Sequence, residues 1–194
     1  ILLQKMQSPE ERIAAHEQTG YYIEVDGLQV FVCAKGKGEA VVCLHGVPTS
    51  SYLYRKMIDG LAAQGMRGIS FDLPGLGLSD RPNNFDYSWT GLATFSRKIV
   101  KNLALERFHL VVHDLGGPVG LEMATHFREN LLSLTILNTI VEPHRFRKPW
   151  TMAPFAMPII DRIWLGSIND FLFVFLMHLQ GIKDKNAVSK AELL

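Results

Sequence analysis

The sequence predicts an α/β fold in which a mostly parallel sheet is flanked by helices. Strand and helix patterns alternate along most of the chain, and such alternation implies crossover connections between parallel strands. The 194 residues are 47% hydrophobic, which suits one sizeable buried core. The expected parallel strands are 40–44, 67–71, 107–113 and 132–138, and the expected helices between them are 52–64, 90–104 and 117–129.

The N-terminal segment is expected to place a helix and a hairpin before the first parallel strand. A polar helix is predicted around residues 9–16. Two strand patterns, at 21–25 and 28–34, flank Asp26-Gly27, a dipeptide that is typical of a tight hairpin turn.

Polar loops follow the first two parallel strands. The run Ala40-Val41-Val42-Cys43-Leu44 is typical of a buried strand, and it breaks into His45-Gly46-Val47-Pro48-Thr49-Ser50-Ser51 before a helical pattern begins. The next strand leads into a loop that ends at Asp80. Because the ends of parallel strands meet at one edge of a sheet, where ligands bind, we expect these loops to line a site.

The stretch Val111-Val112-His113-Asp114-Leu115-Gly116-Gly117 predicts a strand, a sharp turn and a helix. Such a turn exposes its central side chain, here Asp114, and the glycines after it let the helix pack close. An aspartate side chain has an ordinary pKa of about 3.9, so it is ionised at neutral pH. It can therefore displace a leaving group from carbon and form an alkyl ester on the enzyme.

Water must then open that ester, and the oxyanion that forms needs hydrogen-bond donors. We expect the backbone N–H groups of Val47 and Leu115 to converge on an oxygen of the Asp114 ester. His45 and Gly46 belong to the same oxyanion loop. We favour the backbone of Val47 over the ring of His45 as the donor.

Together these segments resemble the α/β-hydrolase family, and specifically its aspartate-nucleophile branch of haloalkane dehalogenases and epoxide hydrolases. The resemblance covers roughly residues 20–140. The run from His45 to Lys56 is most similar to the dehalogenases, as is the valine two positions before Asp114. The resemblance implies an α/β-hydrolase fold with Asp114 as the catalytic nucleophile and with neither cofactor nor metal.

Two positions depart from the dehalogenase pattern at the leaving group. The family commonly holds the departing halide with a tryptophan directly after the nucleophile, where this chain has Leu115, and many members carry a polar side chain where this chain has Val47. Neither side chain can donate a hydrogen bond. The donor for a halide is therefore expected from the cap, with Trp150 and Trp164 as the candidates. An epoxide oxygen would need a tyrosine, and none follows Tyr87.

The resemblance leaves the general base and the acid of the triad unassigned within the chain. The family's water-activating histidine comes after the last strands, so we interpret the chain as the N-terminal portion of a longer protein. Some dehalogenases carry the acid after the strand at 132–138, but the residue there is Asn138. Glu142 is a remote candidate, and the alternative is an acid one strand later.

The chain is expected to divide into an N-terminal part of the hydrolase core, residues 1–140, and the beginning of a helical cap, residues 141–194. Prolines, aromatic residues and methionines dominate the second segment. Helices are predicted at 159–165 and 168–179. Their apolar faces are interpreted as packed core or as the lining of an apolar pocket.

Composition agrees with an enzyme that acts on a small molecule in the cytoplasm. The net charge is +1, which favours neither a nucleic acid nor another polyanion as partner. The longest apolar block, 171–177, is too short to cross a bilayer. Cys33 and Cys43 are expected to be buried thiols rather than a disulfide. The predicted partners are a small apolar substrate and water, with a second chain completing the fold or a homodimer as a further expectation.

Each site residue also has a structural interpretation. Asp114 is a residue type that is favoured as a helix N-cap. Asp72 and Asp80 are interpreted as residues that fix their loop. Three functions stay open: haloalkane dehalogenase-like hydrolysis, which we favour, epoxide hydrolysis, and ligand binding on a hydrolase fold without turnover.

Overall fold

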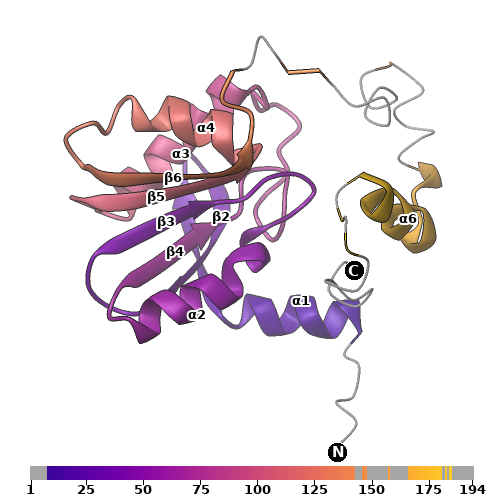
Figure 1. The fold of residues 1–194 in the computed structure, drawn as a ribbon, viewed down its shortest axis with the longest axis horizontal. Coiled ribbons are helices and arrows are strands. Elements are labelled where there is room, and N and C mark those ends of the chain that lie inside the picture. The colour runs from indigo at the N-terminus through magenta and orange to yellow at the C-terminus, as the bar shows by residue number, and fades with distance from the viewer. Residues whose placement is uncertain are drawn as a thin grey trace, which may run out of the picture. The chain divides into compact units, whose positions relative to one another are not determined.

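The computed structural model describes residues 8–142, 146–147, 157, 166–180, 182 and 184. The chain divides into two compact units, one of Ala15–His144 and one of Ile1–Ala14 with Arg145–Leu194. The first unit holds the sheet and the helices that cover it (Figure 1).

The sheet has six strands in the order β1-β2-β4-β3-β5-β6. The first two strands form an antiparallel hairpin, and β2 also runs antiparallel to β4, whereas β4, β3, β5 and β6 are parallel to one another. The mostly parallel sheet predicted from the sequence is therefore confirmed. The strands are β1 (Gly20–Val25), β2 (Leu28–Lys35), β3 (Ala40–Leu44), β4 (Arg67–Phe71), β5 (Phe108–Asp114) and β6 (Leu131–Thr139).

Helices cover both faces of the sheet. Figure 1 shows α2 on one face, with α3 and α4 on the other. The larger apolar cluster lies under α3 and α4, and a smaller one around Phe31 and Ile58 lies under α2. The helices of this unit are the end of α1 (Pro9–Glu17), the 3-10 helix η1 (Ser51–Tyr54), α2 (Arg55–Ala63), α3 (Trp89–Asn102) and α4 (Gly116–Ala124).

Local sequence signals explain several boundaries. The hairpin turns at Asp26 and Gly27, whose φ angles of 52° and 76° lie in the left-handed region that a two-residue turn requires. The side chain of Ser88 accepts a hydrogen bond from the N–H of Gly91 and so caps the start of α3.

Two predicted helices differ from the observed ones. The helix predicted over 52–64 begins with the 3-10 turn η1, which Ser50 caps through the N–H of Tyr52. The helix predicted over 117–129 ends at Ala124. There the hydroxyl of Thr125 donates to the carbonyl of Glu122, and the chain leaves through turns. Side chains of this kind compete with helical bonds and so favour helix ends.

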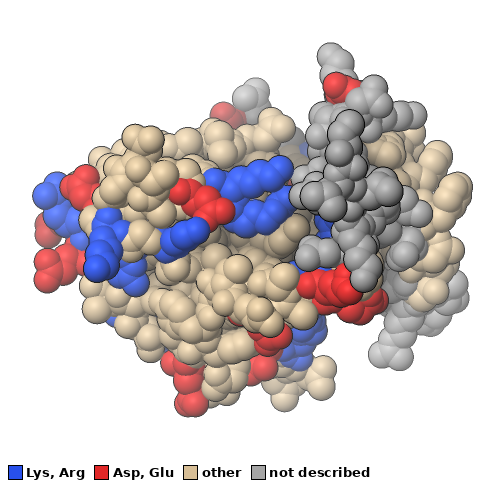
Figure 2. Space-filling view, turned by 90° about the horizontal axis from the view of Figure 1, so that it is seen from below, with Lys and Arg blue, Asp and Glu red and all other residues tan. Residues whose placement is uncertain are grey.

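Cys33 and Cys43 are both free and buried, as predicted. The chain carries a net charge of +1. On the face drawn in Figure 2, Lys and Arg side chains lie next to Asp and Glu side chains.

The second unit contains α6 (Asp170–Gln180), close to the helix predicted at 168–179. The helix predicted at 159–165 lies outside the described residues. Among the helices that the structure describes, none has both the length and the apolar character needed to span a membrane.

Candidate active site

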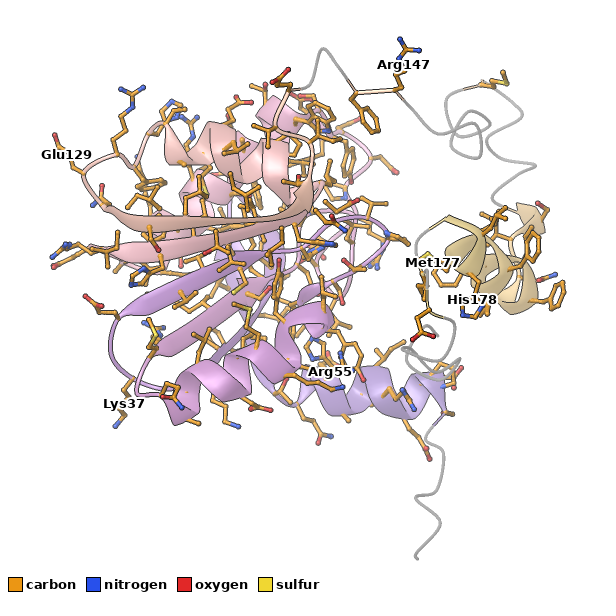
Figure 3. The ribbon with its side chains drawn as sticks, viewed as in Figure 1. Lys37, Arg55, Glu129, Arg147, Met177 and His178 are labelled. Atoms are coloured by element: carbon orange, nitrogen blue, oxygen red, sulfur yellow. The ribbon has the colours of Figure 1, made fainter. Side chains whose placement is uncertain are left out.

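The site residues lie at the carboxyl ends of β3 and β5, two neighbouring strands in the middle of the parallel part of the sheet. The chain leaves β3 toward β4 on one side and later enters β5 on the other side, so the strand order reverses here. Such a switch point is where open α/β sheets bind ligands. In Figure 3, Lys37 and Glu129 mark the opposite end of the sheet, and Arg55 lies at the start of α2.

Asp114 sits on the sharp turn between β5 and α4. Its φ angle is 51°, which is unusual for a residue other than glycine and typical of a strained turn that exposes a reactive side chain. A Cβ atom on Gly116 would lie 2.4 Å from the carbonyl oxygen of Leu44, and one on Gly117 would lie 1.6 Å from Oγ1 of Thr139. The close helix packing predicted from these glycines is therefore confirmed.

The backbone carbonyl of Asp114 also accepts a hydrogen bond. The hydroxyl of Thr139, at the end of β6, donates a hydrogen bond to it. The turn is thus fixed from the neighbouring strand, by a residue that the sequence analysis did not single out.

Both backbone donors predicted from the sequence meet at one oxygen of Asp114. The N–H of Val47 donates to Oδ1 at 2.9 Å, and the N–H of Leu115 donates to the same atom at 2.6 Å. Among the residues that the structure describes, none donates a hydrogen bond to Oδ2. The N-terminus of α4 adds a partial positive charge beside the carboxylate.

The ring of His45 contacts the loop backbone. Its Nε2 accepts a hydrogen bond from the N–H of Leu73 at 3.1 Å, so the proton is on Nδ1, which donates to the carbonyl of Gly46 at 2.9 Å. Burial lowers the pKa of His45, which keeps the ring neutral. His45 therefore acts on the shape of the loop, and its ring hydrogen bonds do not include Asp114.

Gly46 allows the loop to approach the carboxylate. A Cβ atom at this position would lie 2.3 Å from both Cβ and Oδ1 of Asp114. Only glycine fits between the two segments.

The loop after β4 is fixed by its carboxylates. Oδ1 of the buried Asp72 accepts from the N–H of Ser51 at 2.6 Å, and Oδ2 accepts from the N–H of Leu78 at 2.7 Å. Asp80 accepts from the N–H of Gln29. The structure thus agrees with the loop-fixing interpretation of both residues.

A buried histidine outside the predicted site contacts the end of the loop that follows β3. His16, in the last turn of α1, packs edge-on against Phe31 and Tyr52, and its Nε2 lies 2.9 Å from the hydroxyl of Ser51. No local pattern predicts this contact, because the two residues are 35 positions apart.

The other predicted residues are placed as follows. His113 precedes Asp114 on β5, and the described residues offer its Nδ1 no hydrogen-bond partner. Glu142 is exposed. Trp150 and Trp164 lie outside the described residues. Within the described part of the chain, no cluster of His, Cys, Asp and Glu side chains could hold a metal ion.

The fold and this turn define the class of protein. Asp114 occupies a strained strand-to-helix turn and its carboxylate faces two backbone N–H donors, as in the strand–turn–helix element of α/β-hydrolase sheets. A family model described as alpha/beta hydrolase fold matches residues 39–186, and the chain belongs to this family.

Relatives in this family include dehalogenases. The chain is 37% identical over 113 residues to a haloalkane dehalogenase of Mycobacterium marinum, a match that covers 58% of this chain and 38% of that protein. It is 35% identical over 120 residues to the mesoderm-specific transcript homolog protein of Bos taurus, covering 59% of this chain and 36% of that protein. The chain thus spans well under half of these relatives.

Solved structures show the same fold. The epoxide hydrolase CorEH matches with a TM-score of 0.78 and 25% identity, covering 90% of this chain and 65% of that one. The haloalkane dehalogenase DatA from Agrobacterium tumefaciens matches with a TM-score of 0.69 and 27% identity, covering 78% of this chain and 53% of that one.

Proposed function

We propose that the protein hydrolyses a small apolar electrophile through a covalent ester on Asp114, with haloalkane dehalogenase-like chemistry. One observation carries this proposal. Val47 and Leu115 both donate to Oδ1 of Asp114, and no described residue donates to Oδ2. One carboxylate oxygen is therefore held by the donors, while the other is available to attack.

The first step is a displacement at carbon. An electron pair of Oδ2 forms the new C–O bond, and the carbon–halogen bond breaks, so that the halide leaves with its electron pair. Asp114 then carries a neutral alkyl ester whose carbonyl oxygen is Oδ1.

The second step is hydrolysis. Water attacks Cγ of the ester as a base removes one of its protons, and negative charge develops on Oδ1, where the N–H groups of Val47 and Leu115 stabilise it. The bond between Cγ and Oδ2 then breaks. Oδ2 leaves in the alcohol, which takes up a proton, and the oxygen from water remains on Asp114.

The choice of substrate rests on the relatives. The dehalogenase of Mycobacterium marinum supports a halide as the leaving group. The likeness to the epoxide hydrolase CorEH supports epoxide opening as the second candidate. In either case the side chains of Val47 and Leu115 supply no donor to the leaving group, so the proposal requires one from another part of the protein.

The proposal is tested by turnover of the full-length protein in water enriched in the heavy oxygen isotope. Dibromoethane and styrene oxide are the two trial substrates. After many turnovers, the peptide that contains Asp114 gains heavy oxygen, because each hydrolysis leaves a water oxygen on Cγ. Mass spectrometry of the digested protein measures the gain, and the substrate that produces it distinguishes halide from epoxide.

Two variants complete the test. Asp114→Asn abolishes both turnover and labelling, because the neutral amide is a poor nucleophile. Asp59→Asn removes an exposed carboxylate that pairs with Lys35, and it keeps both. Product alcohol that takes its oxygen from water in a single turnover, with no label on Asp114, would contradict the ester mechanism. No turnover of any trial substrate would favour the ligand-binding alternative.

A further inference from the structure

The peptide unit that joins Gly46 to Val47 is held from its carbonyl side. The carbonyl of Gly46 accepts from the hydroxyl of Thr49 at 2.9 Å, from the N–H of Thr49 at 3.1 Å, and from Nδ1 of His45 at 2.9 Å. These contacts come from one residue before the peptide unit in the sequence, His45, and one residue after it, Thr49.

Hydrogen bonds to the carbonyl of Gly46 also set the direction of the N–H of Val47, which belongs to the same peptide unit. In a planar trans peptide, the C=O and N–H bonds point in opposite directions. When the carbonyl of Gly46 is fixed toward Thr49 and His45, the N–H of Val47 must point the other way, where it meets Oδ1 of Asp114 at 2.9 Å. Val47 itself is exposed, so packing of its own side chain contributes little to this direction.

We propose that Thr49 is a positioning residue, whose hydroxyl holds the Gly46 carbonyl and so keeps the N–H of Val47 aimed at Asp114. The described structure gives the hydroxyl of Thr49 no hydrogen bond to Asp114, so its effect passes through the peptide unit. The kinetic part of this inference rests on the function proposed above.

The two chemical steps respond differently to this N–H. During ester formation, Oδ1 loses negative charge, so a donor there gives no help to the transition state. During ester hydrolysis, Oδ1 gains negative charge, and the same donor stabilises the transition state. If the N–H of Val47 no longer points at Oδ1 of Asp114, hydrolysis therefore slows selectively and the alkyl ester accumulates.

The test uses three substitutions in the full-length protein. Thr49→Val keeps the shape of the side chain and removes its hydroxyl. Thr49→Ser keeps the hydroxyl and is expected to behave like the wild type. Thr125→Val is the matched control, because the hydroxyl of Thr125 also donates to the carbonyl three residues earlier, at 2.7 Å, but at the opposite end of α4 from the turn.

Rapid-quench mass spectrometry with dibromoethane measures the two steps separately. We expect Thr49→Val to slow ester hydrolysis about tenfold, with ester formation unchanged, since one hydrogen bond is lost. Thr49→Ser and Thr125→Val keep the wild-type rates. Equal slowing of both steps, no slowing, or failure of Thr49→Ser to restore hydrolysis would overturn the proposal.

Amide hydrogen exchange at Val47 supplies a readout that needs no turnover. Exchange at this N–H is expected to become about tenfold faster in Thr49→Val, and to stay unchanged in Thr49→Ser and Thr125→Val. Unchanged exchange in Thr49→Val would overturn the positioning role. A wild-type protein that forms no ester, together with faster exchange in Thr49→Val, would instead contradict the proposed function and leave the positioning role supported.

Discussion

Asp114 and its neighbours show what a local pattern can predict at the scale of single residues. The apolar run, the polar pair and the two glycines predicted a sharp turn with an exposed side chain at Asp114; the φ angle of 51° agrees with the turn, and the side chain is half-buried. The strand pattern at 40–44 and the polar loop after it, at the shared edge of a parallel sheet, predicted that the N–H groups of Val47 and Leu115 meet at this carboxylate, as observed. The contacts of Thr49, Thr139 and His16 were missed, because ordinary residue types make them only after the chain folds.

Gly46 is a residue-scale test of the site. Gly46→Ala places a Cβ atom 2.3 Å from Cβ and Oδ1 of Asp114, so the loop or the carboxylate must move. We expect kcat/KM to fall by more than about a hundredfold, because the Val47 donor is displaced. The expected loss in the free energy of unfolding is about 1–3 kcal/mol. Steady-state kinetics and urea unfolding measure the two effects.

Gly60→Ala is the control for that substitution. Gly60 lies in α2, and a Cβ atom there meets nothing within 4 Å. The change should leave kcat/KM intact and raise the free energy of unfolding by about 0.5–1 kcal/mol, because alanine restricts the unfolded chain. Similar kinetic losses in both variants would refute the steric explanation for Gly46.

At the scale of elements, periodicity predicted the strands better than the helix ends. The strand expected at 67–71 matches β4, and the one at 40–44 matches β3. The helix expected over 117–129 stops at Ala124, because Thr125 bonds the carbonyl of Glu122. A capping hydroxyl of this kind is invisible to an apolar pattern that continues past it.

The edge strand β6 carries a prediction about association. In the described part of the chain, β6 pairs only with β5, and Leu134, Ile136 and Leu137 on it are exposed. An open edge with exposed apolar side chains favours pairing with another strand. We therefore expect the 194-residue chain, studied alone, to self-associate in sedimentation velocity experiments as its concentration rises.

A charge on the strand should weaken this association. Ile136→Lys is expected to shift the chain toward the monomer, whereas Met57→Lys, at an exposed apolar residue of α2, is not. A monomeric wild-type chain, or an equal effect of the two lysines, would show that β6 is not the contact.

At the scale of the whole molecule, buried histidines tie stability to pH. Burial lowers the pKa of His16, although Asp72 raises it and Arg55 lowers it further, and burial also lowers the pKa of His45. In the unfolded chain these histidines have ordinary pKa values near 6.5. As the pH falls below this value, they therefore bind protons in the unfolded chain before they do so in the folded protein. Stability is therefore full above about pH 6.5 and falls as the pH drops below it.

The expected slope is up to about 1.4 kcal/mol in the free energy of unfolding per pH unit for each histidine. Urea unfolding between about pH 7 and about pH 5 measures it. A His16→Gln variant should show a shallower slope than the wild type. Identical slopes for the two proteins would mean that His16 contributes nothing to the acid sensitivity.

The N–H groups of Val47 and Leu115 both donate to Oδ1 of Asp114, and this makes the two oxygens of the carboxylate unequal. In the proposed mechanism Oδ1 stays with the enzyme through every cycle, whereas the atom in the Oδ2 position departs with each product molecule and is renewed from water. A group that is chemically symmetric in solution thus has one permanent atom and one exchanged atom. As long as both N–H groups stay bonded to Oδ1, heavy oxygen from the solvent enters only the Oδ2 position, however many turnovers the protein completes.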